Sequence, residues 1–228
     1  MHLTLSRRCA RWCALALLGC CTLAGAAGPL PPAQQARLDA AVSVYDSGRL
    51  DDARRQFEAL AREGVPAAHF NLAVMHQRRE LPGANDADAR ALLERAAKGG
   101  FVTAQFTLAR TLDNGELGVR DLALAHRWYE VAAVSGSADA QVAMGTAHFL
   151  GRGLPRDMTR AAHWFREAAR AGDVGAQYLL ASLYESGDGV EQDLRLARYW
   201  YDVAAKNGDE AAPAKVKALD ERAARKPS

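Results

Sequence analysis

Small apolar and aromatic residues recur along the chain with a period of 36 residues, separated by polar and glycine-rich stretches. Five alanines hold one repeat position: Ala68, Ala104, Ala140, Ala176 and Ala212. Three tryptophans, each followed by an aromatic residue, hold another: Trp128, Trp164 and Trp200. Because apolar residues spaced three or four positions apart share one face of a helix, each period predicts a pair of amphipathic helices.

The last full period shows the predicted helix pair most clearly, with a first helix over 176–186 and a second over 193–206. Gly187 and Gly189 are expected to end the first helix, since glycine takes the left-handed backbone conformation common at helix C-termini. Asp193 is expected to begin the second helix, where its carboxylate can accept hydrogen bonds from free backbone N–H groups.

Such a helix pair cannot bury its apolar face alone, so neighbouring pairs must stack. The expected fold is therefore an all-α solenoid. The repeat boundaries predict a divergent tetratricopeptide-like repeat over 36–67, four similar repeats over 68–211, and a C-terminal capping helix and tail over 212–228. Within the repeat at 68–103, Arg79 and Asn85 replace the loop glycine and the aspartate that opens the second helix.

The N-terminal residues have the order of a secretory signal peptide. Three arginines precede an apolar run that is too short to span a bilayer, and small residues end it at Ala26. The sequence predicts a signal peptide over 1–26, a linker over 27–35 and export to the periplasm. The alternative is a signal over 1–19 with a lipidated Cys20, which would make the protein an outer-membrane lipoprotein. All four cysteines precede Gly28, so the body of the chain has no disulfide framework.

The repeats resemble the Sel1-like repeat family. The residues that match its pattern in the last full period are Ala176, Leu180, Tyr184, Gly187, Gly189, Val190, Asp193, Ala197, Trp200, Tyr201, Ala204, Ala205 and Gly208. Ala181 departs from a family glycine, and the loop glycines at 115–118 are shifted. The resemblance implies an adaptor protein, as is typical of exported bacterial members. Activities of the cysteine-rich branch are not implied, because its cysteines are missing here.

Charge and chemistry exclude several function classes. The chain has 29 Lys and Arg against 27 Asp and Glu, without the basic excess of a nucleic-acid-binding protein. It contains neither a G-x-S-x-G nor an H-E-x-x-H motif, and we assign no catalytic residue, metal ligand or cofactor. His76 and His148 share a repeat position with Tyr184 and are expected to fill an aromatic slot in the packing.

The face of the first helices that packing leaves free is the expected binding groove, on the concave side of the solenoid. Its predicted residues are Asn71, Met75, Arg78, Thr107, Arg110, Thr111, Asn114, Thr146, Leu150, Leu179, Ser182, Leu183 and Ser186. The alternative is that Leu179 and Leu183 belong to the core. The groove predicts a monomeric, non-enzymatic scaffold that binds an unidentified peptide or protein partner. Alternative functions are an envelope hydrolase acting on cell-wall or ester substrates and a lipid-anchored outer-membrane assembly factor, with membrane attachment only through Cys20.

Overall fold

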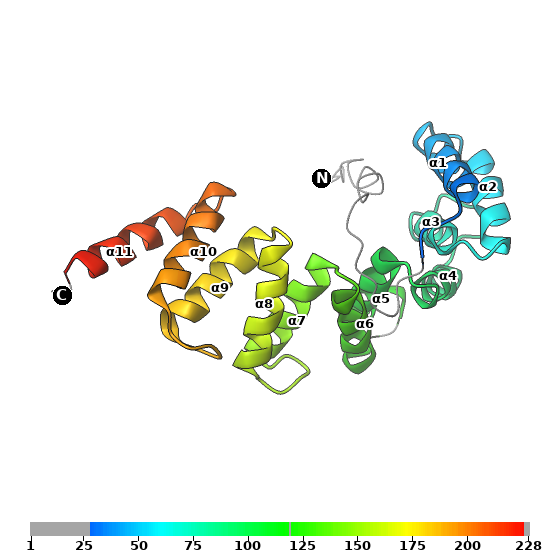
Figure 1. Ribbon diagram of the computed structural model, residues 1–228. Helices are drawn as coiled ribbons and strands as arrows, with labels where there is room; N and C mark the ends of the chain where they lie inside the picture. The colour runs from blue at the N-terminus through cyan, green and yellow to red at the C-terminus, as the bar shows by residue number, and fades with distance from the viewer. Residues whose placement is uncertain (1–27, 119, 226–228) are drawn as a thin grey trace, which may run out of the picture. The chain divides into compact units, whose positions relative to one another are not determined.

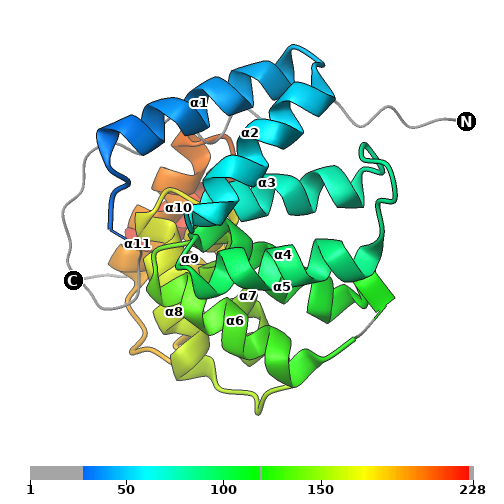
Figure 2. The same cartoon turned by 90° about the vertical axis from the view of Figure 1, so that its right-hand side faces the viewer.

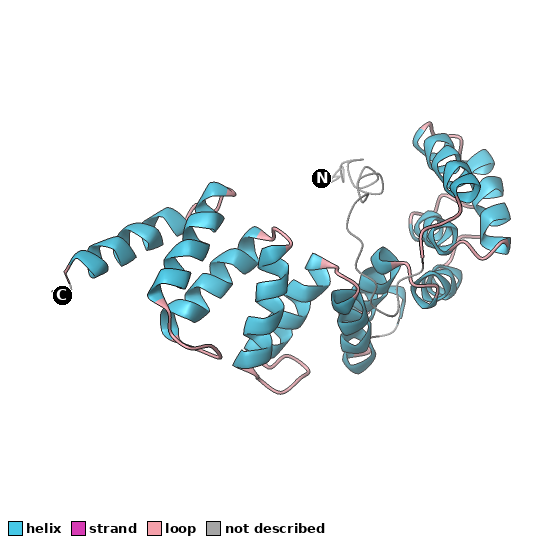
Figure 3. Ribbon diagram, in the orientation of Figure 1, coloured by secondary structure: helices cyan, strands magenta, loops and turns pink. Residues whose placement is uncertain are grey.

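The computed structural model describes residues 28–118 and 120–225, and all regular elements in these residues are helices (Figure 1; Figure 3). The predicted signal peptide and Cys20 lie outside the described residues. The chain divides into two compact units, the first ending at Phe101 and the second beginning at Val102.

The first unit contains two helix pairs. They are α1 (Pro32–Asp46) with α2 (Leu50–Arg62), and α3 (Pro66–Gln77) with α4 (Asp86–Lys98). Figure 2 shows the two helices of each pair lying side by side. Helix α2 also packs against α3, so the pairs form one continuous apolar core that includes the fully buried Phe57 and Met75.

The second unit contains three helix pairs and a final helix. The pairs are α5 (Val102–Asn114) with α6 (Leu122–Val134), α7 (Ala138–Leu150) with α8 (Met158–Arg170), and α9 (Val174–Ser186) with α10 (Leu194–Lys206). A short 3-10 turn, η2 (Glu116–Gly118), follows α5, and α11 (Ala212–Ala224) packs against α10. Each pair contacts the next through α6 and α7 or through α8 and α9. This succession of packed pairs confirms the predicted α-solenoid.

Aspartates begin the second helices of the three pairs in the second unit, as the sequence predicts. The Asp121 carboxylate accepts a hydrogen bond from the Leu124 backbone N–H at 2.9 Å, and Asp157 does the same for Arg160 at 2.9 Å. Asp193 accepts from two backbone N–H groups, those of residues 195 and 196. These carboxylates pair with N–H groups that have no partner inside the helix, which fixes where each helix starts.

The alanines that repeat every 36 residues lie at the helix contacts. All five are completely buried: Ala68, Ala104, Ala140, Ala176 and Ala212. Their small side chains allow neighbouring helices to approach closely, while Phe165 and Tyr201 on the second helices fill the wider spaces. Close packing of this kind makes the core sensitive to changes of a single methyl group.

A buried glutamine on a first helix joins it to the end of the preceding second helix. The side-chain amide of Gln141 donates to the Ala133 carbonyl at 3.1 Å, and that of Gln177 donates to the Ala169 carbonyl at 3.2 Å. Both carbonyls belong to the last turn of a helix, where backbone oxygens have no partner within the helix. The repeated Ala-Gln pairs of the sequence therefore include a structural hydrogen bond between repeats.

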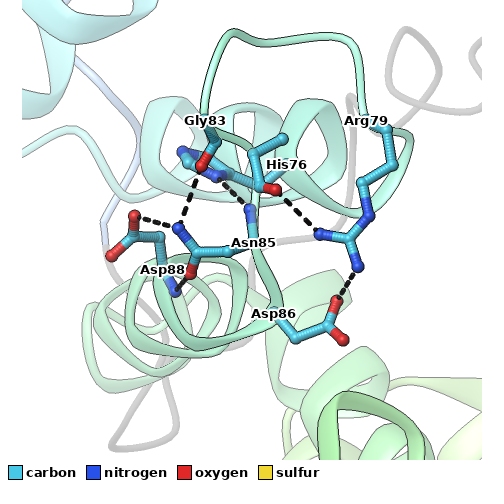
Figure 4. A network of polar contacts seen from close by, with 7 residues as sticks. His76, Arg79, Gly83, Asn85, Asp86 and Asp88 are labelled. Atoms are coloured by element: carbon cyan, nitrogen blue, oxygen red, sulfur yellow. Dashed lines mark hydrogen bonds and ion pairs between the residues drawn. The ribbon is translucent and has the colours of Figure 1, made fainter.

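The loop between α3 and α4 keeps a left-handed residue after the first helix and a cap before the second, although both residues differ from those of the later repeats (Figure 4). Arg79 adopts a left-handed backbone conformation with φ 57°, and its guanidinium bonds to the Asp86 carboxylate at 2.9 Å. Asn85 caps α4 by accepting from the Asp88 backbone N–H at 2.8 Å. Asn85 thus performs the task of the aspartates in the later repeats, and the sequence changes at this loop have not removed the turn.

The second glycine of the loop is required by close packing between repeats. Gly189 has φ 71°, and a Cβ atom at this residue would lie 2.2 Å from the carbonyl carbon of Met158, at the start of α8. In the repeat at 102–137 the corresponding residue is Leu117, which adopts φ 60° and ψ 27°. A leucine in this region is strained, because its Cβ crowds the following carbonyl oxygen.

Candidate binding surface

Three of the residues predicted to line the groove lie in the core instead. Met75 is completely buried in the first unit, and Leu183 belongs to the core cluster of α8 and α9. Thr111 is also buried, with its hydroxyl donating to the Leu108 carbonyl at 2.9 Å. These three residues hold the same repeat position, which faces the neighbouring helix. They cannot contact a partner in the folded protein, and we remove them from the predicted surface.

The other two predicted residues of the first unit, Asn71 and Arg78, already have partners there. The Asn71 amide donates to the Ala67 carbonyl at 2.8 Å. Arg78 is exposed, and its guanidinium donates to the Tyr45 hydroxyl at 2.7 Å. The Tyr45 hydroxyl in turn donates to the Glu80 carboxylate at 2.8 Å. Arg78 and Asn71 therefore form hydrogen bonds within the first unit.

The other eight predicted residues are exposed or half-buried on three successive first helices of the second unit. We call this set the first-helix surface: Thr107, Arg110 and Asn114 on α5, Thr146 and Leu150 on α7, and Leu179, Ser182 and Ser186 on α9. Leu179 is half-buried and packs on the core cluster of α8 and α9, so the core interpretation holds for it in part. The remaining seven residues are free to meet a partner over at least part of their side chains.

An ion pair brings the ends of α5 and α7 together on this surface. The Arg152 guanidinium lies 2.6 Å from the Asp113 carboxylate. Asp113 directly precedes Asn114 in the sequence, and Arg152 follows Leu150 by two residues. Leu150 is 63% exposed, the largest exposure among the bulky apolar side chains of the described residues. Arg110 is also exposed, and its guanidinium stands over the Phe106 ring, 6.0 Å from the ring centroid. The surface thus offers an apolar side chain and a cation.

Two buried tyrosines on second helices, Tyr129 on α6 and Tyr201 on α10, lie beside carboxylates. The Tyr201 hydroxyl donates to the Glu185 carboxylate at 2.8 Å, and the Lys215 ammonium lies 3.0 Å from the same carboxylate. Burial opposes the ionisation of Glu185, but the hydrogen bonds from Lys215 and Tyr201 outweigh it and lower its pKa. Burial, with the neighbouring Asp113 carboxylate, raises the pKa of Tyr129 to about 12. Both tyrosines therefore remain neutral at physiological pH and act as hydrogen-bond donors.

Two histidines are buried near Asp113 and Arg152. His148 is 3% exposed, and neither of its ring nitrogens has a hydrogen-bond partner within the described residues. His126 is buried under the loop of the next repeat, where its ring lies close to Gly153. Burial lowers the pKa of His126, and the Arg152 guanidinium and the neighbouring His148 ring lower it further against the opposing effect of Asp113.

The remaining histidine of the predicted aromatic slot makes a polar contact. His76 is half-buried, and its Nδ1 accepts a hydrogen bond from the Asn85 backbone N–H at 3.4 Å (Figure 4). It helps to hold the loop before α4. In the part of the chain that the structure describes, no three His, Cys, Asp or Glu side chains are placed to hold a metal ion together.

Sequence reasoning about the first helices missed a hollow of about 680 Å³ beside the loop from α9 to α10. Its lining includes Arg166 of α8, Tyr184 of α9 and Leu196 of α10. Leu196 is 39% exposed, and Tyr199, on the same helix, is 55% exposed. The sequence feature that could have indicated this hollow is the positive charge of Arg166, at a repeat position where the other repeats carry an acidic residue.

Comparison with known proteins identifies the repeats. A family model of the Sel1 repeat matches residues 66–101, 102–137, 138–173 and 174–209. A Sel1 repeat protein from Oxalobacter formigenes is similar in structure, with 34% identity and a TM-score of 0.67 over 74% of this chain and 49% of that one. The protective antigen c5321 of uropathogenic Escherichia coli, which displays an SLR fold, shares 28% identity with a TM-score of 0.72 over 82% of this chain and 41% of that one.

This chain therefore spans less than half the length of those two proteins. No match to the sequence is found among curated proteins. Over residues 28–118 and 120–225, none of the helices combines the length and the apolar character needed to cross a membrane.

Proposed function

The chain belongs to the Sel1 repeat family, and we propose that it is an exported, non-enzymatic scaffold that binds a peptide or partner protein on its first-helix surface. Sel1 repeat proteins generally mediate protein–protein interactions. What we propose for this chain in particular is the surface that binds the partner and the location in which it does so. The periplasmic location rests on the signal-like residues 1–26.

The observation that carries the proposal is the exposure of Leu150 among polar side chains at the ends of two joined helices. A leucine that becomes fully buried on binding stabilises a complex by about 1.5–3 kcal/mol. Arg110 adds a cation that has no carboxylate partner among the described residues, and a charge of this kind favours a specific orientation of the partner. An apolar anchor surrounded by polar groups is typical of a binding surface.

The test is crosslinking in intact cells, followed by affinity capture of the tagged protein and mass spectrometry. The variant carries Arg110→Glu and Leu150→Glu. Leu183→Glu would be unsuitable, because it places a charge in the core and would unfold the repeat. The matched control carries Arg127→Glu and Val134→Glu, which make the same kind of change at exposed residues of α6, a second helix.

We expect a partner that is captured by the wild type and by the control but lost from the Arg110/Leu150 variant. All three proteins should have the same helix content by circular dichroism. Capture of the same partners by all three proteins would refute the first-helix surface as the binding site.

Attachment to the membrane is tested separately. In the soluble, exported form that we propose, palmitate does not label the protein. Labelling of the wild type that disappears in Cys20→Ala would instead establish the lipid-anchored alternative.

A further inference from the structure

Arg166 reverses the charge at a repeat position that is otherwise acidic. The residues at this position in the other four repeats are Glu58, Glu94, Glu130 and Asp202. Three of these acids form ion pairs four residues apart within their own helix: Arg54–Glu58, Arg90–Glu94 and Asp202–Lys206. The residues four positions before and after Arg166 are Ala162 and Arg170, so the same pairing is not available to it. One repeat thus carries a cation whose charge the repeat does not neutralise.

The contacts of Arg166 leave most of its donors free. Its guanidinium donates to the Tyr184 hydroxyl at 3.1 Å and stands over the Tyr184 ring, 5.9 Å from the ring centroid. No carboxylate within the described residues forms an ion pair with it. A guanidinium has five N–H donors in a planar fork that suits a carboxylate, and Tyr184 takes one of them. The ring of Tyr184 holds the guanidinium in place without cancelling its charge.

Arg166 lines the hollow beside the loop from α9 to α10, together with apolar side chains. Val190, Leu194 and Leu196 supply the apolar part of the lining. Asp193 also lines the hollow, but its carboxylate accepts hydrogen bonds from two backbone N–H groups at the start of α10 and is held as a helix cap. Glu191 and Arg195 also line the hollow and are exposed, and Arg195 lies 3.8 Å from the Asp193 carboxylate. Arg166 is the cation of the lining that has no carboxylate partner among the described residues.

The apolar surface continues beyond the hollow along α10. Leu196 is at its rim, and Tyr199 lies about one helical turn further on, since three residues separate them. The Tyr199 ring packs edge-on against Trp200, with 5.2 Å between the ring centroids, and this contact limits its rotation. A rigid, exposed aromatic ring is a favourable contact for a partner, because little side-chain entropy is lost when it becomes buried.

We propose that this hollow binds a segment of a partner protein in which a carboxylate side chain lies next to a leucine-sized or aromatic side chain. The carboxylate meets the Arg166 guanidinium, and the apolar side chain covers Leu196 and Tyr199. This inference rests on the proposed scaffold function but assigns it a second surface, formed by α8, the loop and α10. The hollow indicates which side chains the partner presents, whereas the first-helix surface does not.

The test uses a displayed library of random peptides, selected on the mature tagged protein. Peptides that bind are synthesised with a fluorophore, and their dissociation constants are measured by fluorescence anisotropy. The two test variants are Arg166→Gln and Leu196→Ser. The control is Arg160→Gln on the same helix, since Arg160 is exposed and forms an ion pair with the cap residue Asp157. Circular dichroism and urea unfolding establish that all variants remain folded.

We expect the selected peptides to share an acidic residue beside a leucine or an aromatic residue. Loss of a charge-assisted hydrogen bond should raise the dissociation constant by about tenfold or more in Arg166→Gln, with a smaller rise in Leu196→Ser and no change in Arg160→Gln. Arg166→Lys should bind better than Arg166→Gln, because it keeps the charge.

The result that overturns the proposal is a set of peptides without a shared acid, or binding that survives Arg166→Gln. Binding that is lost in Arg110→Glu with Leu150→Glu but kept in Arg166→Gln supports the first-helix surface and rejects the hollow. The reverse pattern supports the hollow, while the capture experiment with the Arg110/Leu150 variant decides on the first-helix surface, so the two proposals fail independently.

Discussion

The Phe149 ring packs edge-on against Phe165, with 6.4 Å between the ring centroids, at the two repeat positions that Glu185 and Tyr201 hold one repeat later. The preceding repeat has Asp113 and Tyr129 at these positions. An acid is therefore present where the buried ring carries a hydroxyl, and an apolar ring is present where it does not. The reason is that a buried hydroxyl without a hydrogen-bond partner is costly.

This pairing predicts a coupling energy between Glu185 and Tyr201. Tyr201→Phe alone should reduce the free energy of unfolding by about 1 kcal/mol, through the lost hydrogen bond. Glu185→Phe alone should reduce it by about 2 kcal/mol, because the Tyr201 hydroxyl loses its acceptor. The double variant should lose about 1 kcal/mol less free energy of unfolding than the sum of the losses in the two single variants. Urea unfolding of the four proteins measures this, and strictly additive losses would contradict the pairing.

Leu117 predicts a gain in stability from glycine. Its left-handed backbone conformation strains a side chain that has a Cβ, and the corresponding residues in the next two repeats are Gly153 and Gly189. Leu117→Gly should be more stable than Leu117→Ala by about 1 kcal/mol, since alanine keeps the strain and glycine removes it. Comparing these two variants by thermal unfolding separates the backbone effect from the loss of leucine contacts. Equal melting temperatures would show that the backbone at residue 117 is unstrained.

Gly189→Ala is expected to damage the contact between two repeats. The new methyl group would meet the Met158 backbone at 2.2 Å, so α8 and the loop must move apart. The control is Gly172→Ala, which has φ 96° and open space around the new methyl group, and therefore tests the backbone conformation alone. Gly189→Ala should lose at least about 2 kcal/mol more than the control in urea unfolding. Similar losses in both variants would mean that the contact yields easily.

His126 predicts that the second unit becomes less stable in acid. Its pKa is lowered in the folded protein, mainly by burial, so the unfolded chain takes up a proton more readily. Stability should be complete above the ordinary histidine pKa of about 6.5 and should fall as the pH drops from there towards the lowered value. His126→Asn should flatten this dependence in unfolding experiments between pH 5 and 8, over the range in which histidine titrates.

The matched control for this experiment is His163→Asn, at an exposed residue of α8. It should leave the pH dependence as it is in the wild type. His69 in the first unit also has a lowered pKa through burial, so part of the dependence should persist in His126→Asn. An unchanged pH profile in His126→Asn would show that His126 is not responsible.

The sequence was sufficient to predict the helix pairs and their ends, because these depend on local chemistry. Helix α10 begins after Asp193, as the aspartate indicates. Helix α9 begins at Val174, two residues earlier than predicted, because the Asp173 carboxylate accepts from the Ala176 backbone N–H at 2.7 Å and caps it. The cap residue Asp173 lies three residues before Ala176, the repeated alanine from which the prediction started the helix.

The binding surface was predicted only in part. A stripe at three- and four-residue spacing defines one face of a helix, but it does not show how much of that face the neighbouring helix covers. The position of Met75, Thr111 and Leu183 turned out to be covered. Because one of these side chains is polar and two are apolar, the residue types at this position did not indicate that it is buried. The hollow at Arg166 was missed because the prediction considered the first helices alone, whereas three consecutive helices, α8 to α10, form the hollow together.

The glutamine contacts of Gln141 and Gln177 have a consequence for how such a chain can change in length. Each contact joins an amide on one repeat to a main-chain carbonyl on the repeat before it, and a main-chain carbonyl is present whatever the side chain is. A duplicated repeat that carries its own Ala-Gln pair would find the same acceptor at the end of any second helix. Whole repeats can then be inserted or deleted without redesign of the joint, so the number of repeats is free to follow the size of the partner.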